Sequence, residues 1–301
     1  MTNPIYIIGN NALACYLGAQ LQSGGNDVIM LLDRKNAAEA MATDGISIKE
    51  DRSLTQKRHK LNAATFMKEP AKMVIIADYA NKINGALSNV SAIKTGNAPV
   101  VCFTPLKDMS YLAPIVGKNL HPAYFNGYVM TSKNTVSLLG RNTNITLCPP
   151  ENGEIDPIAL NTFTESRMQI SASSNRLLSF WEFFAPYALC SLLSAAENQK
   201  ISDILKDKAN KEAMRPLVDE FCCLAQTDDV VLRADAVLKT IYSTPANYIY
   251  PLHQSVWNGG RNEFNLISSV ISTAELKAGS SFPQIGILLK KLYKLILNPT
   301  L

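Results

Sequence analysis

The sequence predicts an α/β domain with a Rossmann-like doubly wound sheet, followed by an all-α C-terminal domain. In the first half, continuous apolar runs alternate with helical segments, which is typical of a parallel sheet covered on both faces. A glycine turn joins the first apolar run to a helix. From about residue 171 the pattern changes to helices without strands, with a shift in composition near Ile170–Ser174.

The first strand, turn and helix carry a candidate phosphate-binding turn. Ile5–Ile8 is apolar and β-branched, and it runs into a glycine and the helical segment Ala12–Leu21. The dinucleotide fingerprint is G-x-G-x-x-G/A, and Gly9 and Ala14 fill its first and third places. Asn11 stands at the second, where its side chain must either swing aside or hydrogen-bond the phosphate itself. The candidate cofactor-binding residues of this turn are Gly9, Asn10, Asn11, Ala12 and Leu13.

The next segments complete a βαβ unit and bear on cofactor choice. The helix closes at Gly24-Gly25, and the apolar run Val28–Leu32 ends in Asp33 and Arg34. A carboxylate there would bind the ribose hydroxyls of NAD, whereas an arginine would favour the 2′-phosphate of NADP. Both signals are present, so either cofactor fits. Alternatively, Asp33 only caps the next helix, expected at Asn36–Met41.

The remaining elements continue the alternation of strands and helices in the first half of the chain, and only helices follow in the second half. Residues 44–66 are expected to make an antiparallel excursion, and a dinucleotide-binding domain is assigned to residues 1–170. A helical substrate or dimerisation domain is assigned to residues 171–301. The other expected strands are Met73–Ala77, Val100–Phe103, Tyr124–Leu139 and Asn144–Cys148. The expected helices are Asn81–Thr95, Ile158–Glu165, Arg176–Glu197, Ile201–Ala209, Lys211–Ala225, Asp228–Tyr242 and a pair ending in Leu288–Leu297.

Bulk properties exclude several classes of protein. The chain has 301 residues, 47% of them hydrophobic, and a net charge of +4 that is too dispersed for a nucleic-acid reader. Its longest apolar run, Phe183–Ala196, is shorter than the ~20 residues needed to cross a bilayer and is expected to form a core helix. The six cysteines lack C-x-x-C spacing, so buried thiols of a reducing compartment are expected rather than disulfides or a metal site. Without a signal peptide, the protein is expected in the cytoplasm.

Several local matches give the chain a resemblance to the ketopantoate reductase family over nearly its whole length. They are the Gly9 turn, the approach Asn175–Trp181, the segment Gly260–Phe264 and the segment Gly279–Pro283. The resemblance implies reduction of a small 2-keto acid with NADPH, in a cleft between a Rossmann domain and a helical domain. It also implies a place in pantothenate biosynthesis, and a homodimer is compatible with it.

The chain departs from this family at its functional positions. The family's catalytic lysine, two residues beyond the tryptophan, is here Phe183. Of the family's other functional residues, only Glu263 keeps its identity. The replacements are Tyr187 and Ser191 for two asparagines, Pro105-Leu106 for an Asn-Gly pair, Tyr79 for a lysine and Pro251 for a serine.

Candidate catalytic residues follow from what the reaction needs. Hydride transfer to a ketone builds negative charge on oxygen, so an acid or a cation must be in reach. Tyr187 could donate the proton if Arg261 or His253 supplied a neighbouring charge, and Glu263 could accept a substrate hydroxyl. The alternative is that Phe183 and Tyr187 are packed in the interdomain core.

The expected substrate-binding residues are Ser191, His253 and Arg261, while His59 and His121 are expected on the surface or in loops.

Three functions stay open: an NAD(P)-dependent oxidoreductase with altered catalytic groups, a nucleotide-binding sensor or partner subunit without catalysis, and a scaffold that binds neither cofactor nor substrate. The sequence favours the first narrowly, because the architecture and Glu263 are intact.

Overall fold

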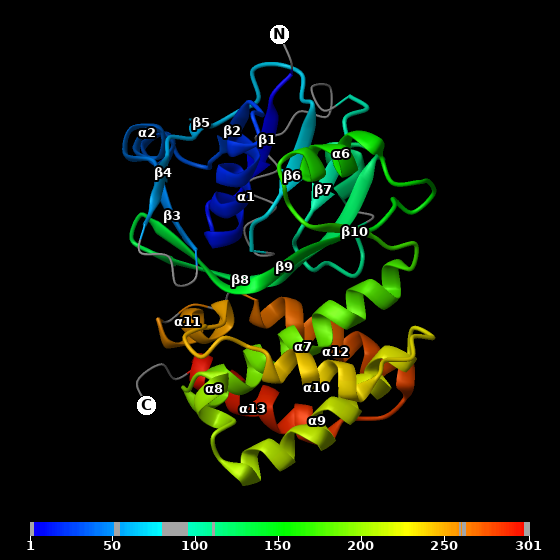
Figure 1. Ribbon diagram of the computed structural model, residues 1–301. Coiled ribbons are helices and arrows are strands. Elements are labelled where there is room, and N and C mark those ends of the chain that lie inside the picture. Colours follow the sequence, from blue (N-terminus) through cyan, green and yellow to red (C-terminus); the bar gives the residue numbers. More distant parts are fainter. Residues whose placement is uncertain are drawn as a thin grey trace. The chain divides into compact units, whose positions relative to one another are not determined.

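The computed structural model describes residues 3–50, 55–79, 96–109, 112–258, 260 and 263–297. The chain divides into two compact units, Met1–Arg176 and Leu177–Leu301 (Figure 1). The expected helix at 81–95 and the candidate residue Arg261 lie outside the described residues. Strand β10 (Ile170–Ala172) pairs with strand β9 (Thr135–Leu147) of the first unit, so the first unit continues beyond residue 170.

The first unit is built around a parallel sheet whose central strand is β1 (Ile5–Ile8). All four residues of β1 are buried, as expected for a strand covered on both faces. Helix α1 (Ala12–Ser23) leads to β2 (Val28–Leu31), which pairs in parallel with β1. On the other side of β1 lies β6 (Met73–Ile76), followed by β7 (Val100–Cys102).

This strand order places a topological switch point between β1 and β6. From β1 the chain adds β2 and then β5 (Asn62–Ala64) on one side, and later adds β6 and β7 on the other. Ligands of open α/β sheets bind outside the carboxyl ends of the strands at such a point. The turns that follow β1 and β6 are therefore the part of this unit best placed for a ligand.

Beyond β7 the sheet is mixed, with both parallel and antiparallel pairs. The expected excursion is present as β3 (Ile46–Glu50) and β4 (Lys57–His59), which pair antiparallel. The long strands β8 (Leu120–Ser132) and β9 (Thr135–Leu147) form a hairpin. Among the described residues, the other helices of the unit are α2 (Lys35–Asp44), α5 (Ala113–Val116) and α6 (Pro157–Glu165).

The turn of this hairpin is not where the sequence predicted it. We expected the chain to break between Leu139 and Asn144, but it reverses at Lys133 and Asn134, where Lys133 has a left-handed φ of 51°. The predicted break is instead an irregularity within the ladder, where the register shifts opposite Gly127. Polar residues and glycine occur both in bulges and in turns, so the local sequence does not distinguish the two.

Two histidines of the first unit are buried, which corrects the expectation that they lie on the surface or in loops. His59 is on β4, and His121 is on β8 with no exposed surface. The ring nitrogens of His121 lie 3.2 Å from the Cys148 carbonyl oxygen and 2.8 Å from Asn119 Oδ1. The prediction failed because it judged histidine by its polarity, whereas both residues lie on paired strands and are buried there.

Burial lowers the pKa of His121, despite the opposing effects of the Cys148 carbonyl and Asp156, and burial lowers the pKa of His59 as well. A histidine held neutral in the folded state contributes stability above its unfolded pKa of about 6.5, and that contribution is lost as the pH falls below it. We therefore expect the free energy of unfolding of the first unit to decrease from pH 7.5 to 5.5 in urea titrations. His121→Gln should show a smaller decrease, and an equal decrease in both proteins would contradict this account.

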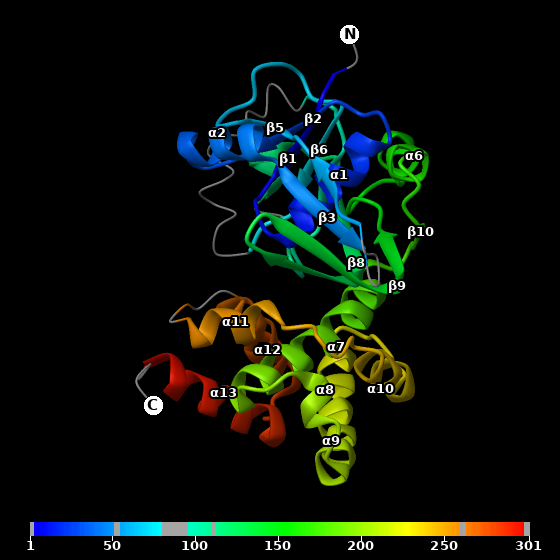
Figure 2. The same ribbon diagram turned by 60° about the vertical axis from the view of Figure 1, so that its left-hand side comes forward.

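The second unit contains helices and no strand among its described residues. Its helices are α7 (Arg176–Glu197), α8 (Ile201–Ile204), α9 (Lys208–Gln226), α10 (Ala234–Tyr242), α11 (Pro251–Trp257), α12 (Phe264–Ala278) and α13 (Pro283–Leu297), and Figure 2 shows them from another side. The helix expected at Ile201–Ala209 is too long, because Asp207 caps α9 by accepting a hydrogen bond from the Ala209 N–H at 2.7 Å. Helix α11 was not predicted.

Helix α7 is the core helix of this unit, with the bounds that the sequence predicted. By length and composition alone it could cross a membrane, but 67% of its most apolar window is buried. Phe180, Trp181 and Phe184 form an aromatic cluster on its buried side, with Phe180 and Phe184 stacked at 4.9 Å between ring centroids. These contacts indicate a core helix of a globular unit.

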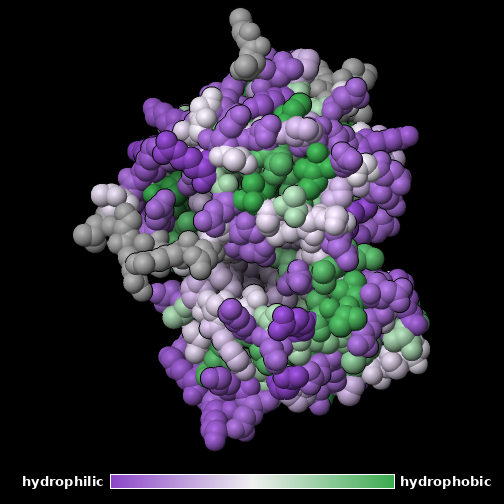
Figure 3. Space-filling view, turned by 45° about the vertical axis from the view of Figure 1, so that its right-hand side comes forward, coloured by the Kyte–Doolittle hydropathy of each residue, from purple (hydrophilic) through white to green (hydrophobic). Residues whose placement is uncertain are grey.

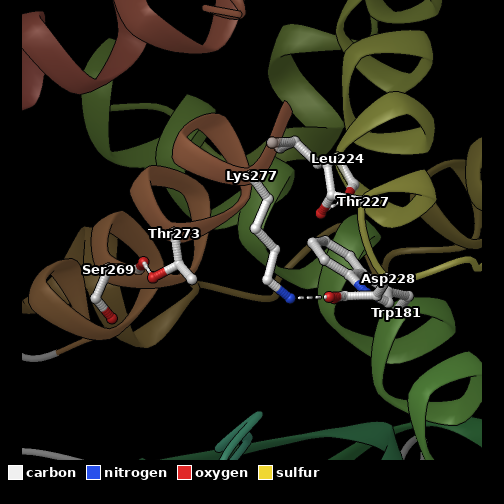
Figure 4. A network of polar contacts seen from close by, with 7 residues as sticks. All are labelled: Trp181, Leu224, Thr227, Asp228, Ser269, Thr273 and Lys277. Atoms are coloured by element: carbon white, nitrogen blue, oxygen red, sulfur yellow. Dashed lines mark hydrogen bonds and ion pairs between the residues drawn. The ribbon is translucent and has the colours of Figure 1, made fainter. Parts of the chain in front are cut away.

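A polar network ties α7 to α12 through the segment after α9 (Figure 4). The Asp228 carboxylate accepts hydrogen bonds from Trp181 Nε1 at 2.9 Å and from Lys277 Nζ at 2.8 Å. The Asp228 side chain is 3% exposed, whereas that of Lys277 is 51% exposed. Helix α10 begins at Ala234 and not at Asp228 as expected, because Asp229 has a left-handed φ of 59° that interrupts a helix.

Lys277→Met is expected to destabilise the second unit by about 1–3 kcal/mol, because the buried carboxylate loses a charged hydrogen-bond donor whose own exposure limits the effect. The matched control is Lys206→Met. Its ion pair with Asp203 has nearly the same length, 2.7 Å, but the carboxylate is 46% exposed. Urea unfolding should show a clear loss for the first variant and little change for the second. Equal effects would mean that burial of Asp228 does not strengthen the pair.

The cysteines are free thiols, and four of the six are buried. Cys223 is exposed, which corrects the expectation of buried thiols at that position. Among the residues that the structure describes, no group of three or more His, Cys, Asp or Glu side chains could hold a metal ion.

Figure 3 shows that hydrophilic residues cover most of one face of each unit and that apolar residues gather in separate patches.

Candidate active site

The turn after β1 is held tightly by the neighbouring strand. Gly9 has a φ of 127°, and a Cβ atom there would lie 2.4 Å from the Ala77 carbonyl oxygen. The Ala77 N–H donates to the Ile8 carbonyl at 2.9 Å, so the segments that follow β1 and β6 are hydrogen-bonded to each other. Only glycine fits this position, and the turn lies at the switch point of the sheet.

Asn11 shapes the N-terminus of α1. It is the N-cap residue, and its Oδ1 accepts a hydrogen bond from the Ala14 N–H at 2.9 Å. Of the two alternatives that the sequence left for this side chain, the structure thus shows one in which it turns back onto the helix.

The first amides of α1 remain available to a ligand. The Cys15 N–H donates to the Asn11 carbonyl at 3.1 Å, and the Ala14 N–H is taken by the cap. The N–H groups of Asn11, Ala12 and Leu13 precede them and have no intrahelical partner. These three residues are partly exposed, and Asn10 is exposed. Partly exposed amides at a helix N-terminus suit a phosphate group.

The acidic and basic side chains after β2 are both exposed and lie near each other. Arg34 Nε is 3.6 Å from Asp33 Oδ2. The N-cap of α2 is Arg34, and its side chain makes no capping hydrogen bond. The alternative in which Asp33 caps this helix is therefore wrong, and its carboxylate remains exposed to solvent.

Two residues at the ends of the neighbouring strands were missed by the sequence analysis. The Thr104 hydroxyl donates to the Asp78 carbonyl at 2.7 Å, and Asp78 Oδ1 accepts from the Tyr79 N–H at 2.7 Å. Asp78 and Thr104 follow β6 and β7, so they share the carboxyl edge of the sheet with Gly9. Their place directly after buried strands could have identified them.

In the second unit, helix α7 carries an aromatic pair. The rings of Phe183 and Tyr187 are stacked, with centroids 5.5 Å apart and 17° between their planes. Tyr187 also contacts Tyr250 at 6.1 Å, and Tyr250 packs edge-on against Tyr248 at 4.8 Å. Phe183, at the position where the resemblance places a lysine, thus contacts one face of Tyr187.

The two residues expected to be catalytic are hydrogen-bonded to each other. The Tyr187 hydroxyl donates to Glu263 Oε2, although the residues are 76 positions apart in the chain. Glu263 is 5% exposed and has a left-handed φ of 70° at the start of α12, where its side chain does not cap the helix. The structure therefore brings together an aromatic hydroxyl and a buried carboxyl group.

The expected substrate-binding residues are placed differently from this pair. His253 Nε2 lies 3.0 Å from Asn198 Oδ1, and burial lowers the pKa of His253, which favours its neutral form. Ser191 is fully buried, and within the described part of the chain its hydroxyl has no hydrogen-bond partner. Pro251, at the family's serine position, is the first residue of α11, a place where proline is favoured.

Comparisons with known proteins agree with this architecture. Residues 5–104 match the family model described as ketopantoate reductase PanE/ApbA. The 2-dehydropantoate 2-reductase of Streptococcus pyogenes is 20% identical over 293 residues, 93% of each chain.

Two solved structures share the fold at low identity. D-mandelate dehydrogenase in its ternary structure with NADH and anilino(oxo)acetate has a TM-score of 0.84 at 16% identity, covering 97% of this chain and 98% of its own. The 2-dehydropantoate 2-reductase from Geobacter metallireducens has a TM-score of 0.82 at 18% identity, covering 97% and 99%.

A Rossmann-type unit with a switch-point glycine turn, followed by a helical unit, is the fold that this chain shares with these solved structures. The family model over residues 5–104 and the curated relatives support a likeness to the ketopantoate reductase family.

Proposed function

We propose that the protein is an NAD(P)-dependent oxidoreductase that interconverts a small 2-keto acid and the corresponding 2-hydroxy acid. The observation that carries this proposal is the hydrogen bond between Tyr187 and Glu263. It supplies a proton-transfer group in a chain whose family lysine is replaced by Phe183.

The residues of the first unit fit a dinucleotide. The N–H groups of Asn11, Ala12 and Leu13 would bind the diphosphate, and Asp33 or Arg34 would bind the adenosine ribose. When bound, the nicotinamide supplies or accepts the hydride. The partly exposed helix terminus and the close packing of Gly9 on Ala77 support this assignment.

Tyr187 is the proposed proton donor to the substrate oxygen. Phe183 cannot donate a proton, but its stacking on Tyr187 limits the positions of the hydroxyl. Glu263 is the residue that the family resemblance assigns to the substrate, and in this chain it also binds the donor.

The competing proposal is a protein that binds a nucleotide without catalysis. The replacement of the lysine by Phe183 favours it, and so does the Asn11 cap on Ala14, which leaves fewer free amides than a glycine turn would. Turnover separates the two proposals. The substrate panel includes 2-dehydropantoate and, because of the ligand of D-mandelate dehydrogenase, aryl 2-keto acids.

Thermal melting with NADPH and with NADH tests cofactor binding. Millimolar cofactor at a micromolar site should stabilise the protein by roughly 4 kcal/mol and raise the melting temperature by several degrees. Arg34→Ala should reduce the shift with NADPH if the 2′-phosphate is bound, and Asp33→Asn should reduce the shift with NADH if the ribose is bound. Absence of a shift with either cofactor would exclude the proposed oxidoreductase.

A further inference from the structure

We infer that Tyr187 and Glu263 act as one two-proton acid, which reduces substrate when the carboxyl group is protonated and oxidises it when the carboxyl group is ionised. This inference rests on the proposed function, since it names how the proton reaches and leaves the reacting oxygen. It assigns Glu263 a role beyond holding a substrate hydroxyl.

The hydrogen bond between Tyr187 and Glu263 determines which protonation state of the pair can donate a proton to the substrate. A tyrosine hydroxyl has one proton. When that proton is donated to an ionised Glu263, the hydroxyl offers the substrate only its lone pairs. Tyr187 can therefore protonate a ketone oxygen only when Glu263 carries a proton of its own and returns it to the tyrosine oxygen.

Burial of Glu263 favours a protonated carboxyl group, whereas the hydrogen bond donated by Tyr187 favours an ionised one. The residue is 5% exposed, and an ionised carboxylate is costly to bury. A non-glycine residue with φ near 70° is uncommon, and such conformations persist when the surrounding structure holds them. Glu263 is the N-cap residue of α12, but its carboxyl group makes no capping hydrogen bond and accepts from Tyr187.

The other ionisable groups around the pair come from three elements. Tyr250 and Tyr248 precede α11, and the Tyr250 hydroxyl interacts with Thr244 and with Cys190 of α7. Of the remaining groups, Glu182 of α7 is exposed, His253 of α11 contacts Asn198, and Lys277 of α12 contacts Asp228. Arg261 lies outside the described residues, so the experiment must report the charge of Glu263 directly.

The proton balance is complete in both directions. In reduction, a bound reduced nicotinamide would supply a hydride to the carbonyl carbon, and the electron pair of the C=O π bond would move to oxygen. That oxygen takes the Tyr187 proton, Tyr187 takes the Glu263 proton, and the carboxylate is reprotonated by water. In oxidation, the substrate hydroxyl gives its proton to Tyr187 as Tyr187 gives its own to the Glu263 carboxylate, the O–H electron pair forms the C=O π bond, and a bound oxidised nicotinamide would accept the hydride that leaves the carbon.

The first readout needs neither cofactor nor substrate. Infrared difference spectra across a pH titration should show a protonated carboxyl band that disappears with one midpoint, is absent in Glu263→Gln and is shifted in Tyr187→Phe. The exposed Glu182→Gln is the matched control and should leave the band unchanged. A protein without this band at any pH at which it is active would overturn the inference.

The second readout is the pH dependence of turnover. With the wild-type protein, kcat for reduction should fall and kcat for oxidation should rise with the midpoint of the infrared titration. Glu263→Gln should lower reduction about tenfold or more and remove this midpoint. Active enzyme with the same pH profile in both directions would overturn the inference while the proposed function survives. A titrating band in a protein that turns over no substrate would support the two-proton pair and remove the proposed function.

Discussion

Tyr187→Phe is expected to lower kcat by about 10²- to 10⁴-fold, the usual contribution of a positioned proton donor. The substitution removes one oxygen atom and keeps the ring that stacks on Phe183 at 5.5 Å. Because the first unit provides the proposed cofactor site, the melting shift produced by NADPH or NADH should not change. The measurement is steady-state NAD(P)H oxidation with the best substrate of the panel.

The control for this variant is Tyr242→Phe, which removes a hydroxyl from an exposed tyrosine on α10. It should leave kcat unchanged. Turnover by Tyr187→Phe at the wild-type rate would dismiss Tyr187 as the acid and restore the alternative in which Phe183 and Tyr187 serve only to pack the core.

Gly9→Ala is expected to destabilise the first unit by about 3–5 kcal/mol. The new Cβ would lie 2.4 Å from the Ala77 carbonyl oxygen, and the φ of 127° is unfavourable for any side chain. The carbonyl cannot easily move, because the backbone of Ala77 is hydrogen-bonded to Ile8. Relief of the clash would displace the amides that follow, so the cofactor-induced melting shift should also be lost.

Gly25→Ala separates steric contact from backbone strain. Gly25 also has a positive φ, 87°, but a Cβ atom there would meet nothing within 4 Å. We expect a loss of only about 1 kcal/mol for this variant and normal cofactor binding. Similar losses for the two variants in urea unfolding would show that Gly9 is required only for its conformation.

The elements that could be predicted from sequence are those whose local pattern and tertiary role agree. The strand Ile5–Ile8 is apolar and fully buried, the helix Arg176–Glu197 is apolar and mostly buried, and both have the expected bounds. The hairpin turn was misplaced because a bulge and a turn share the same residue types. His121 was misjudged because its burial depends on partners at Asn119 and Cys148 that only strand pairing brings together.

The candidate site could be predicted only in part. Sequence reasoning named Tyr187 and Glu263 one by one, but their hydrogen bond depends on a left-handed residue at the start of α12 that no local pattern predicts. It named the turn after Gly9 correctly as the start of α1, but did not predict that Asn11 would cap that helix. It missed Asp78 and Thr104, since neither belongs to a motif.

The central claim is that this chain transfers a hydride although Phe183 stands where the family that it resembles has a lysine. Oxidation of NADPH and NADH by the wild-type protein, followed by absorbance with the panel of 2-keto acids, tests it most directly. We predict substrate-dependent oxidation with at least one panel member, reduced at least a hundredfold in Tyr187→Phe. Cofactor binding without oxidation by any panel member, under conditions in which a 2-dehydropantoate 2-reductase is active, would contradict the claim.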